Sequence, residues 1–135
     1  LKTARARSLP MVCANPDMLV IREGRPVVCA GALAKEYEAL GGKVAYRGKP
    51  DPAVYHLAVQ RLGVDRKRIA VVGDALETDV KGAQAADLAA IWCTGGIHAE
   101  ALGVRYGTPA DPAKAAKLAT HEGQMPQAII PGFVW

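Results

Sequence analysis

The chain has 135 residues, half of them apolar, and a net charge of +4 at pH 7. This length and composition are sufficient to bury one hydrophobic core, so a single domain is expected. No apolar run is long enough to span a membrane, and no basic stripe interleaved with aromatic residues indicates a nucleic-acid partner.

Cysteine usage indicates a reducing compartment. Cys13, Cys29 and Cys93 are odd in number and widely spaced, and no Cys-x-x-Cys pair occurs. Neither a disulfide framework nor a zinc site is therefore expected, and a cytoplasmic location is the simplest interpretation. The chain starts at Leu1 rather than Met, and we expect it to be a piece of something longer.

The first third of the chain predicts a strand, a hairpin and a helix. Residues 10–14 form an apolar run that ends in a turn. The short runs 18–21 and 26–29 flank Glu23-Gly24 and indicate a hairpin. A helix is expected over residues 31–40, ending at two glycines, with one apolar face made by Leu33, Tyr37 and Leu40.

The clearest helix signal lies between two predicted strands. Asp51 is a suitable N-cap, Pro52 suits the first helical position, and Gly63 ends the helix. The apolar stripe of this helix consists of Val54, Tyr55, Ala58, Val59 and Leu62. Because the helix follows a short strand at 44–46 and precedes another, it is expected to be a crossover between parallel strands. The ends that carry Lys49 and Asp74 are then expected at the same edge of the sheet.

The next strand leads into two carboxylates. Residues 69–73 read Ile-Ala-Val-Val-Gly, an apolar run that predicts a strand buried on both faces. Asp74 follows at its carboxyl end, and Asp79 comes one turn later. Open α/β sheets bind ligands at the carboxyl ends of their strands, so Asp74 is placed for a metal or a phosphate rather than for packing.

The rest of the chain continues the alternation of helix and strand. The expected elements are a small-residue helix at 80–86, a strand at 88–93, a helix at 98–102, a helix begun by Asp111-Pro112 and a strand at 128–130. This alternation predicts an α/β fold with a mostly parallel sheet.

Polar side chains follow three of the predicted strands. They are Asn15 and Asp17, then Lys49, then Asp74 with Asp79. A lysine ammonium suits phosphate oxygens, and carboxylates suit Mg²⁺. The N-terminus of the helix after Lys49 favours an anion in the same place. The sequence therefore predicts a magnesium and phosphate site at this edge.

Each of these residues also has a purely structural interpretation. Asp79 and Thr78 are suitable caps for the helix that follows them. Lys49 and Asp74 are suitable partners for an ion pair, and residues 15–17 can form a turn without further function. The three histidines lack the spacing of a metal site and are expected to be surface or core residues: His56, His98 and His121.

Two groups of residues resemble the motifs of a known family. Gly48-Lys49-Pro50, followed one strand–helix unit later by Val-Gly-Asp-Ala-Leu-Glu-Thr-Asp at 72–79, resembles the third and fourth motifs of haloacid dehalogenase-like (HAD) hydrolases. Residues 15–17 (Asn-Pro-Asp) with 30–33 (Ala-Gly-Ala-Leu) resemble its class IIA, NagD-like branch, which holds sugar-phosphate and nucleotide-type phosphatases. The resemblance covers residues 8–96.

The resemblance implies a three-layer α/β/α Rossmann-like core and a Mg²⁺-dependent phosphatase that hydrolyses small phosphate monoesters through an aspartyl-phosphate intermediate. Lys49 would hold the phosphoryl group and the nucleophile carboxylate, and Asp74 would bind Mg²⁺. Asp79 would support the catalytic groups and Asn15 would lie near the substrate. We add Thr78 to the substrate-binding candidates.

Two departures from the family pattern matter. Where the family closes the helix after its fourth motif with Ala-Gly, this chain has Ala86-Asp87, and Asp tolerates left-handed backbone less well than Gly. No Asp-x-Asp-Gly nucleophile motif occurs, and the second-motif Ser or Thr and most of the cap are missing. We therefore expect residues 1–135 to be the carboxy-terminal part of a core domain, with residues 1–10 the end of its cap, and to be inactive alone.

The alternative from another class is a noncatalytic phosphate-binding or assembly module that completes its sheet with a partner chain or a second copy. A receiver domain is less favoured because Lys49 precedes Asp74. A dinucleotide-binding domain is less favoured because no Gly-x-Gly-x-x-Gly follows a strand. The expected partner of the enzyme is a small phosphorylated substrate.

Overall fold

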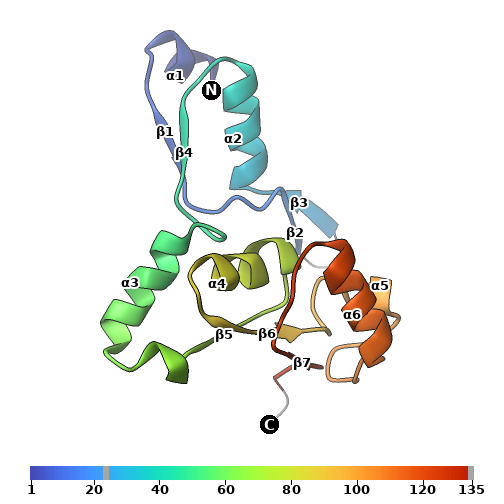
Figure 1. Ribbon diagram of the computed structural model, residues 1–135. Coiled ribbons are helices and arrows are strands. Elements are labelled where there is room, and N and C mark those ends of the chain that lie inside the picture. The colour runs from blue at the N-terminus through green and yellow to red at the C-terminus, as the bar shows by residue number, and fades with distance from the viewer. Residues whose placement is uncertain (23–24, 134–135) are drawn as a thin grey trace. The chain divides into compact units, whose positions relative to one another are not determined.

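The computed structural model describes residues 1–22 and 25–133, and of residues 19–22, 25 and 26 only the backbone. It divides the chain into two compact units, Leu1–Asp51 and Pro52–Trp135. Figure 1 gives the labels of the elements in both units. Among the described residues, no helix combines the length and the apolar character that crossing a membrane requires.

The first unit contains two small sheets and two helices. Strand β1 pairs in parallel with β4, and β2 pairs antiparallel with β3, which confirms the predicted hairpin. The predicted turn at Glu23-Gly24 lies outside the described residues. The elements of this unit are α1 (Lys2–Ala6), β1 (Met11–Cys13), β2 (Leu19–Arg22), β3 (Arg25–Val28), α2 (Ala30–Ala39) and β4 (Val44–Tyr46).

Helix α2 packs against β1 and β4 through small residues and one aromatic ring (Figure 1). Its buried residues are Gly31, Ala34 and Tyr37. Leu33 is 52% exposed, so the expected apolar face through Leu33 is wrong. The packing side is displaced because Gly31 comes so close to the backbone carbonyl of Pro16 that a Cβ there would lie 1.9 Å from its oxygen.

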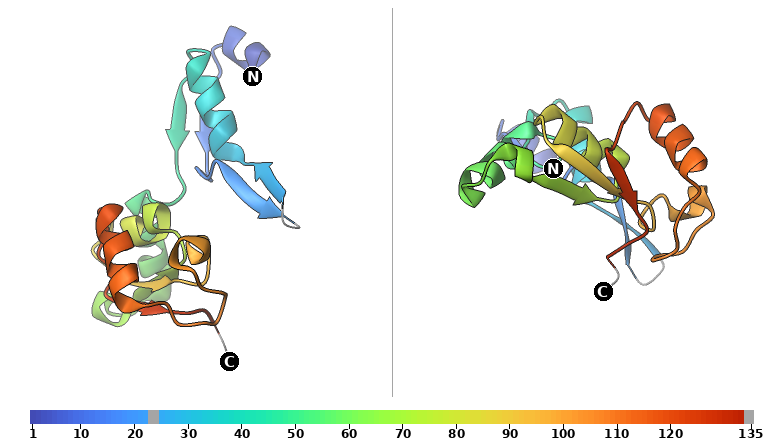
Figure 2. Two further views of the ribbon diagram at one scale, coloured as in Figure 1. Left: turned by 90° about the vertical axis from the view of Figure 1, so that its right-hand side faces the viewer. Right: turned by 60° about the horizontal axis from the view of Figure 1, so that its bottom comes forward.

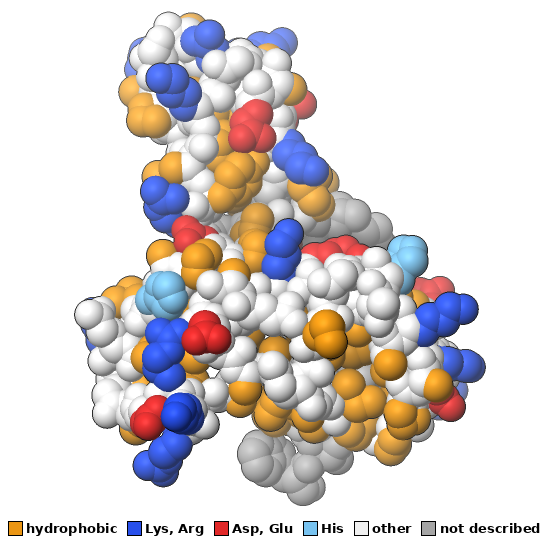
Figure 3. Space-filling view, in the orientation of Figure 1, with side chains coloured by type: hydrophobic (Ala, Val, Ile, Leu, Met, Phe, Trp, Pro, Cys, Tyr) orange, Lys and Arg blue, Asp and Glu red, His pale blue; other side chains and the backbone are white. Residues whose placement is uncertain are grey.

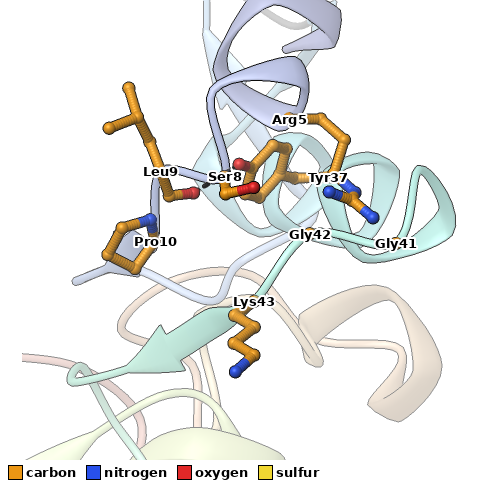
Figure 4. A pocket seen from close by; sticks show the side chains of 8 residues that line it. All are labelled: Arg5, Ser8, Leu9, Pro10, Tyr37, Gly41, Gly42 and Lys43. Carbon is orange, nitrogen blue, oxygen red and sulfur yellow. Dashed lines mark hydrogen bonds between the residues drawn. The ribbon is translucent and has the colours of Figure 1, made fainter.

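Helix α1, which the sequence did not predict, lies at the carboxyl end of α2. The Arg5 Nε donates a hydrogen bond to the Leu40 carbonyl at 3.0 Å, a favourable place for a cation at a helix C-terminus. The buried Tyr37 hydroxyl donates to the Leu9 carbonyl, as Figure 4 shows. A cavity of about 280 Å³ lies here, and its lining residues are Arg5, Ser8, Leu9, Pro10, Tyr37, Gly41, Gly42 and Lys43.

The second unit is built on a three-stranded parallel sheet in the order β5-β6-β7 (Figure 2). Parallel pairing confirms the predicted α/β class. Its elements are α3 (Pro52–Leu62), the 3₁₀ turn η1 (Arg66–Arg68), β5 (Ala70–Gly73), the π-helical turn η2 (Leu76–Val80), α4 (Lys81–Ala85), β6 (Ala89–Cys93), α5 (Ala99–Leu102), α6 (Pro112–His121) and β7 (Ala128–Ile130).

The core of this unit lies around Trp92 of β6, which is fully buried together with Leu76 and Val80 from the turn after β5. Small residues of α4 and α6 complete it, because they let the helices approach closely. Gly82 of α4 is an example, since a Cβ there would lie 2.4 Å from the ring of Tyr55 in α3.

Two expectations about the sheet are wrong. Strand β5 is the end strand of its sheet among the described strands, and Ala70 and Val72 on it are exposed, so it is not buried on both faces. Among the described strands, β4 and β5 belong to separate sheets, so α3 does not connect two strands of one sheet. The reason is that α3 packs on α4 within the second unit, whereas β4 belongs to the first.

Candidate active site

Asp74 directly follows β5 and is held on two sides, which confirms its position at the carboxyl end of that strand. Its carboxylate Oδ2 accepts a hydrogen bond from the Ile97 N–H at 3.0 Å. Its backbone carbonyl accepts another from the Trp92 indole Nε1 at 3.1 Å. A Cβ on Gly96 would lie 2.2 Å from the Asp74 side chain, so only a glycine lets the segment after β6 come this close.

The turn after Asp74 is unusually wide, and Asp79 closes it from within. The Val80 N–H donates to the Ala75 carbonyl five residues back, at 3.2 Å, which is the hydrogen bond of a π-helical turn. The Asp79 carboxylate, only 5% exposed, accepts the Ala75 N–H at 3.1 Å. A Cβ on Gly73 would lie 2.3 Å from that carboxyl carbon. Asp79 therefore closes the start of its own turn. The expectation that it caps the helix after it is wrong, because the N-cap position of α4 is Val80 and α4 has no side-chain cap hydrogen bond.

Tyr55 of α3 braces the same turn from the other side. Its hydroxyl donates to the carbonyls of Thr78 and Asp79, at 3.2 and 3.4 Å. Burial first, and then the nearby Asp79 carboxylate, raise the pKa of Tyr55 to about 12. The Thr78 hydroxyl is buried and finds no hydrogen-bond partner among the residues that the structure describes, so it caps no helix there.

His98, which was expected to be a surface or core residue without a functional role, contacts this turn as well. The Leu76 N–H, the first of η2, donates to His98 Nε2 at 3.4 Å. The His98 ring meets the Trp92 ring edge-on, with centroids 5.6 Å apart at an angle of 77°. Its spacing to other histidines carried no signal, although its position just after a strand end could have provided one.

In the first unit, the segments that carry Asn15 and Lys49 lie against each other. A Cβ on Gly48 would lie 2.1 Å from the Ala14 carbonyl oxygen. Asn15 Oδ1 accepts the N–H of Asp17 at 3.1 Å, which is the turn that its structural interpretation predicted. Asn15 and Lys49 are both exposed, and the Lys49–Pro50 peptide bond is cis.

The predicted site residues therefore form two groups. Asn15 and Lys49 belong to the first unit, and Asp74, Thr78 and Asp79 belong to the second. That Lys49 and Asp74 act on one ligand stays a prediction.

The comparison with protein families decides the family. The sequence profile of the HAD-hydrolase-like family matches residues 46–120, more than half of the chain, including Lys49, Asp74 and Asp79. The chain belongs to this family. It is related to the NagD-like p-nitrophenyl phosphatases among the HAD hydrolases, which confirms the resemblance of its motifs.

Three similar proteins show the extent of the relationship. A haloacid dehalogenase-like hydrolase from Brucella suis 1330 is 37% identical, with a TM-score of 0.70 over 98% of this chain and 47% of its own. A glycerol phosphate phosphatase from Mycobacterium tuberculosis, solved in complex with calcium, is 33% identical, with a TM-score of 0.58 over 67% and 26%. A phosphoserine phosphatase from Thermus thermophilus is 40% identical over 74% and 40%.

The HAD chain thus spans less than half the length of these relatives. Its fold corresponds to the carboxy-terminal part of the HAD core, as the motif order predicted.

The fit of a metal ion to these HAD residues can be tested on the donor set. Within residues 1–22 and 25–133, no three side chains of His, Cys, Asp or Glu gather in a way that could hold a metal. Asp74 Oδ1 accepts no hydrogen bond from the described residues, and an oxygen of this kind suits Mg²⁺. Mg²⁺ in proteins is often bound by only one or two carboxylates, and waters and substrate phosphates supply the other ligands. The Asp74 carboxylate therefore fits Mg²⁺ as one part of such a site.

Proposed function

We propose that this chain supplies the phosphate-binding and metal-binding part of a HAD-type phosphatase that hydrolyses small phosphate monoesters. The observation that carries the proposal is the carboxylate of Asp74. It stands at the carboxyl end of β5, with Oδ2 held by the Ile97 N–H and Oδ1 left for a cation. The phosphatase names of the relatives support the reaction class.

In the proposed reaction, a carboxylate nucleophile outside this sequence attacks phosphorus and the bond from phosphorus to the ester oxygen breaks. The leaving oxygen takes a proton from a general acid that also lies outside this sequence, and the alcohol departs. Water then hydrolyses the aspartyl phosphate. Lys49 would bind phosphoryl oxygens and the nucleophile, where its charge opposes the charge that builds up. Asp74 would hold Mg²⁺, which neutralises phosphate charge when bound. Asp79 would keep the Asp74 turn in shape.

The substrate side is proposed to involve Asn15 and Thr78, and the substrate to be a sugar-phosphate or nucleotide-type ester. Relatives named as dihydroxyacetone phosphatase and acid sugar phosphatase support small phosphorylated compounds. The three cysteines, none of which forms a disulfide in the structure, support a reducing cytoplasm as the place of action.

Magnesium binding tests the role of Asp74. The chain should bind Mg²⁺ weakly, and Asp74→Asn should abolish that binding, because it removes the charged first ligand. Titration calorimetry measures both. Asp87→Asn is the matched control, since it removes the same charge from an exposed site outside this turn. Equal binding by Asp74→Asn and the unchanged chain would remove Asp74 from the metal site.

Turnover tests the part of the proposal that concerns the nucleophile. The 135-residue chain should hydrolyse no aryl phosphate in the presence of Mg²⁺, because its sequence contains no Asp-x-Asp-Gly. A colorimetric assay against a Lys49→Ala control measures this. Turnover above the control would demand another nucleophile.

One observation favours the second candidate, a noncatalytic module completed by a partner chain. Among the described strands, β5 is the end strand of its sheet, and Val72 on it is 37% exposed, so there is room for a further strand to pair there. Phosphate binding that needs neither Mg²⁺ nor Asp74 would support this module over the phosphatase.

A further inference from the structure

The turn after Asp74, η2, lacks a helix cap of the usual kind. The first N–H groups of a helical turn have no partner within the turn, and an N-cap side chain normally accepts one of them. Here the N-cap position of η2 is Ala75, which has no side-chain acceptor. Two other residues take over this function. The Asp79 carboxylate accepts the Ala75 N–H, and His98 Nε2 accepts the Leu76 N–H.

The hydrogen bond from Leu76 fixes the tautomer of His98. A backbone N–H can only donate, so Nε2 must accept and carry no proton. The neutral ring therefore holds its proton on Nδ1. A lysine or arginine at position 98 could not take this role, because neither has an acceptor.

His98 also belongs to the segment that holds the Asp74 carboxylate. The N–H of its neighbour Ile97 donates to Asp74 Oδ2. The Trp92 ring that packs against His98 donates its indole N–H to the Asp74 carbonyl. Residues 97 and 98 thus hold the side chain of Asp74 and the turn that follows it at the same time.

We propose that His98 is a positioning residue of this site: its Nδ1-protonated imidazole accepts the Leu76 N–H and so holds the turn after Asp74, and with it the carboxylate that would bind a cation. We call the hydrogen bond from the Leu76 N–H to His98 Nε2 the clamp. Its role in metal binding rests on the proposed function, whereas the hydrogen bond itself does not. His98 itself touches neither metal nor phosphate.

Two substitutions separate the hydrogen bond from the space that the ring fills. His98→Gln keeps an acceptor oxygen, whereas His98→Leu keeps an apolar side chain without one. His56→Leu is the control, because His56 is exposed on α3. All are made in the full 135-residue chain, and loss of an oriented hydrogen-bond partner behind a ligand typically lowers metal affinity about 10–100-fold.

The first readout is nuclear magnetic resonance. The nitrogen shifts of His98 should show an unprotonated Nε2 and a protonated Nδ1. The Leu76 amide should exchange its hydrogen several-fold faster in His98→Leu than in the unchanged chain, and His98→Gln should restore slow exchange. A protonated Nε2, or equal Leu76 exchange in all three, would overturn the clamp.

The second readout is Mg²⁺ calorimetry. Affinity should fall about 10-fold in His98→Leu and recover in His98→Gln, with no change in His56→Leu. Equal affinity in His98→Leu and the unchanged chain would overturn the link between the clamp and Asp74. If even the unchanged chain binds no Mg²⁺ while the resonance results hold, the proposed function fails and the clamp stands as a structural device of the turn.

Discussion

Asp87 holds a left-handed backbone conformation, with φ of 55°, at the end of α4. The Asp87 N–H donates to the Gln84 carbonyl at 3.0 Å, and the Leu88 N–H donates to the Ala83 carbonyl at 2.9 Å. This is the Schellman arrangement, in which the residue after the helix cap is most often Gly. The left-handed conformation lies at the position where this chain has Asp in place of the family's Gly. Asp87 therefore carries the backbone strain that this replacement predicts.

Replacing Asp87 with Gly should raise the free energy of unfolding by about 0.5–1 kcal/mol, because it relieves the left-handed strain and removes a negative charge from a helix C-terminus. Urea denaturation measures the change. Asp87→Ala is the control, since it removes the charge but keeps the Cβ. If Asp87→Ala stabilised as much as Asp87→Gly, charge rather than backbone strain would explain the gain.

At the scale of elements, helices were predicted better than strand neighbours. Helix α3 begins at Pro52 and ends before Gly63, whose φ is +63°, as the turn and cap residues predicted. The position of strand β5 was predicted correctly, but its burial on both faces was not. An apolar run indicates hydrophobicity and does not indicate which strands lie beside it. Leu33 was misplaced for a related reason. Close packing of α2 uses the absence of side chains at Gly31, which hydrophobic periodicity cannot register.

Only the residues of the candidate site that belong to recognisable motifs were predicted from the sequence. Asp74 and Asp79 follow β5 as expected, since strand ends in an α/β fold position polar residues. His98 was expected to be a surface or core residue without a functional role, because a histidine that accepts a backbone N–H needs no partner at any fixed sequence spacing. Its contact with Leu76 spans 22 residues and depends on the pairing of β5 with β6.

The brace between α3 and η2 gives the fold a dependence on alkaline pH. Tyr55 has a pKa of about 12 in the folded chain and about 10 when unfolded. Between these values the folded chain keeps a proton that the unfolded chain has lost. The stabilisation from this shift is therefore complete below pH 10 and falls as the pH rises toward 12, by at most about 1.4 kcal/mol per pH unit.

Tyr55→Phe should remove this pH dependence. We expect the unfolding free energy of the unchanged chain to exceed that of the variant by a constant amount below pH 10, and the difference to narrow between pH 10 and 12. Urea denaturation at several pH values measures it, and tyrosinate absorbance follows the ionisation directly. A difference that stays constant through this range would show that Tyr55 ionises like an exposed tyrosine.

At the scale of the whole molecule, the proposed catalytic groups are divided between two units. Lys49 lies near the end of the first, and Asp74 and Asp79 lie in the second. The proposed roles of Lys49 and Asp79 differ in whether the side chain contacts the phosphoryl group directly. The proposed function gives Lys49 direct contact with phosphate, whereas the Asp79 carboxylate is occupied with the Ala75 amide and reaches the reaction only through the turn.

In a longer protein that contains the nucleophile, Lys49→Ala should therefore lower kcat/KM more than Asp79→Ala. Loss of one preorganised electrostatic contact costs about 10²–10³ in rate, and loss of a support behind a ligand about 10–100-fold. Steady-state kinetics at saturating Mg²⁺ measures both. Circular dichroism must show that Asp79→Ala folds, since it leaves the Ala75 amide without its acceptor. A folded Asp79→Ala that is the slower enzyme would reverse the assigned roles.

Gly73 and Asp79 lie so close together that the residue at one position limits which residues the other position can hold. A methyl group at 73 and the carboxyl carbon of residue 79 would compete for the same space, 2.3 Å apart. The Asp79 Cβ would lie only 2.4 Å away as well, so a side chain at position 73 is compatible with this backbone only alongside glycine at 79. Glycine at 79 would give up the hydrogen bond to Ala75. In related sequences, both positions should therefore be unchanged or change together. A scan of single substitutions should find both positions intolerant, although one steric conflict between them is the common cause.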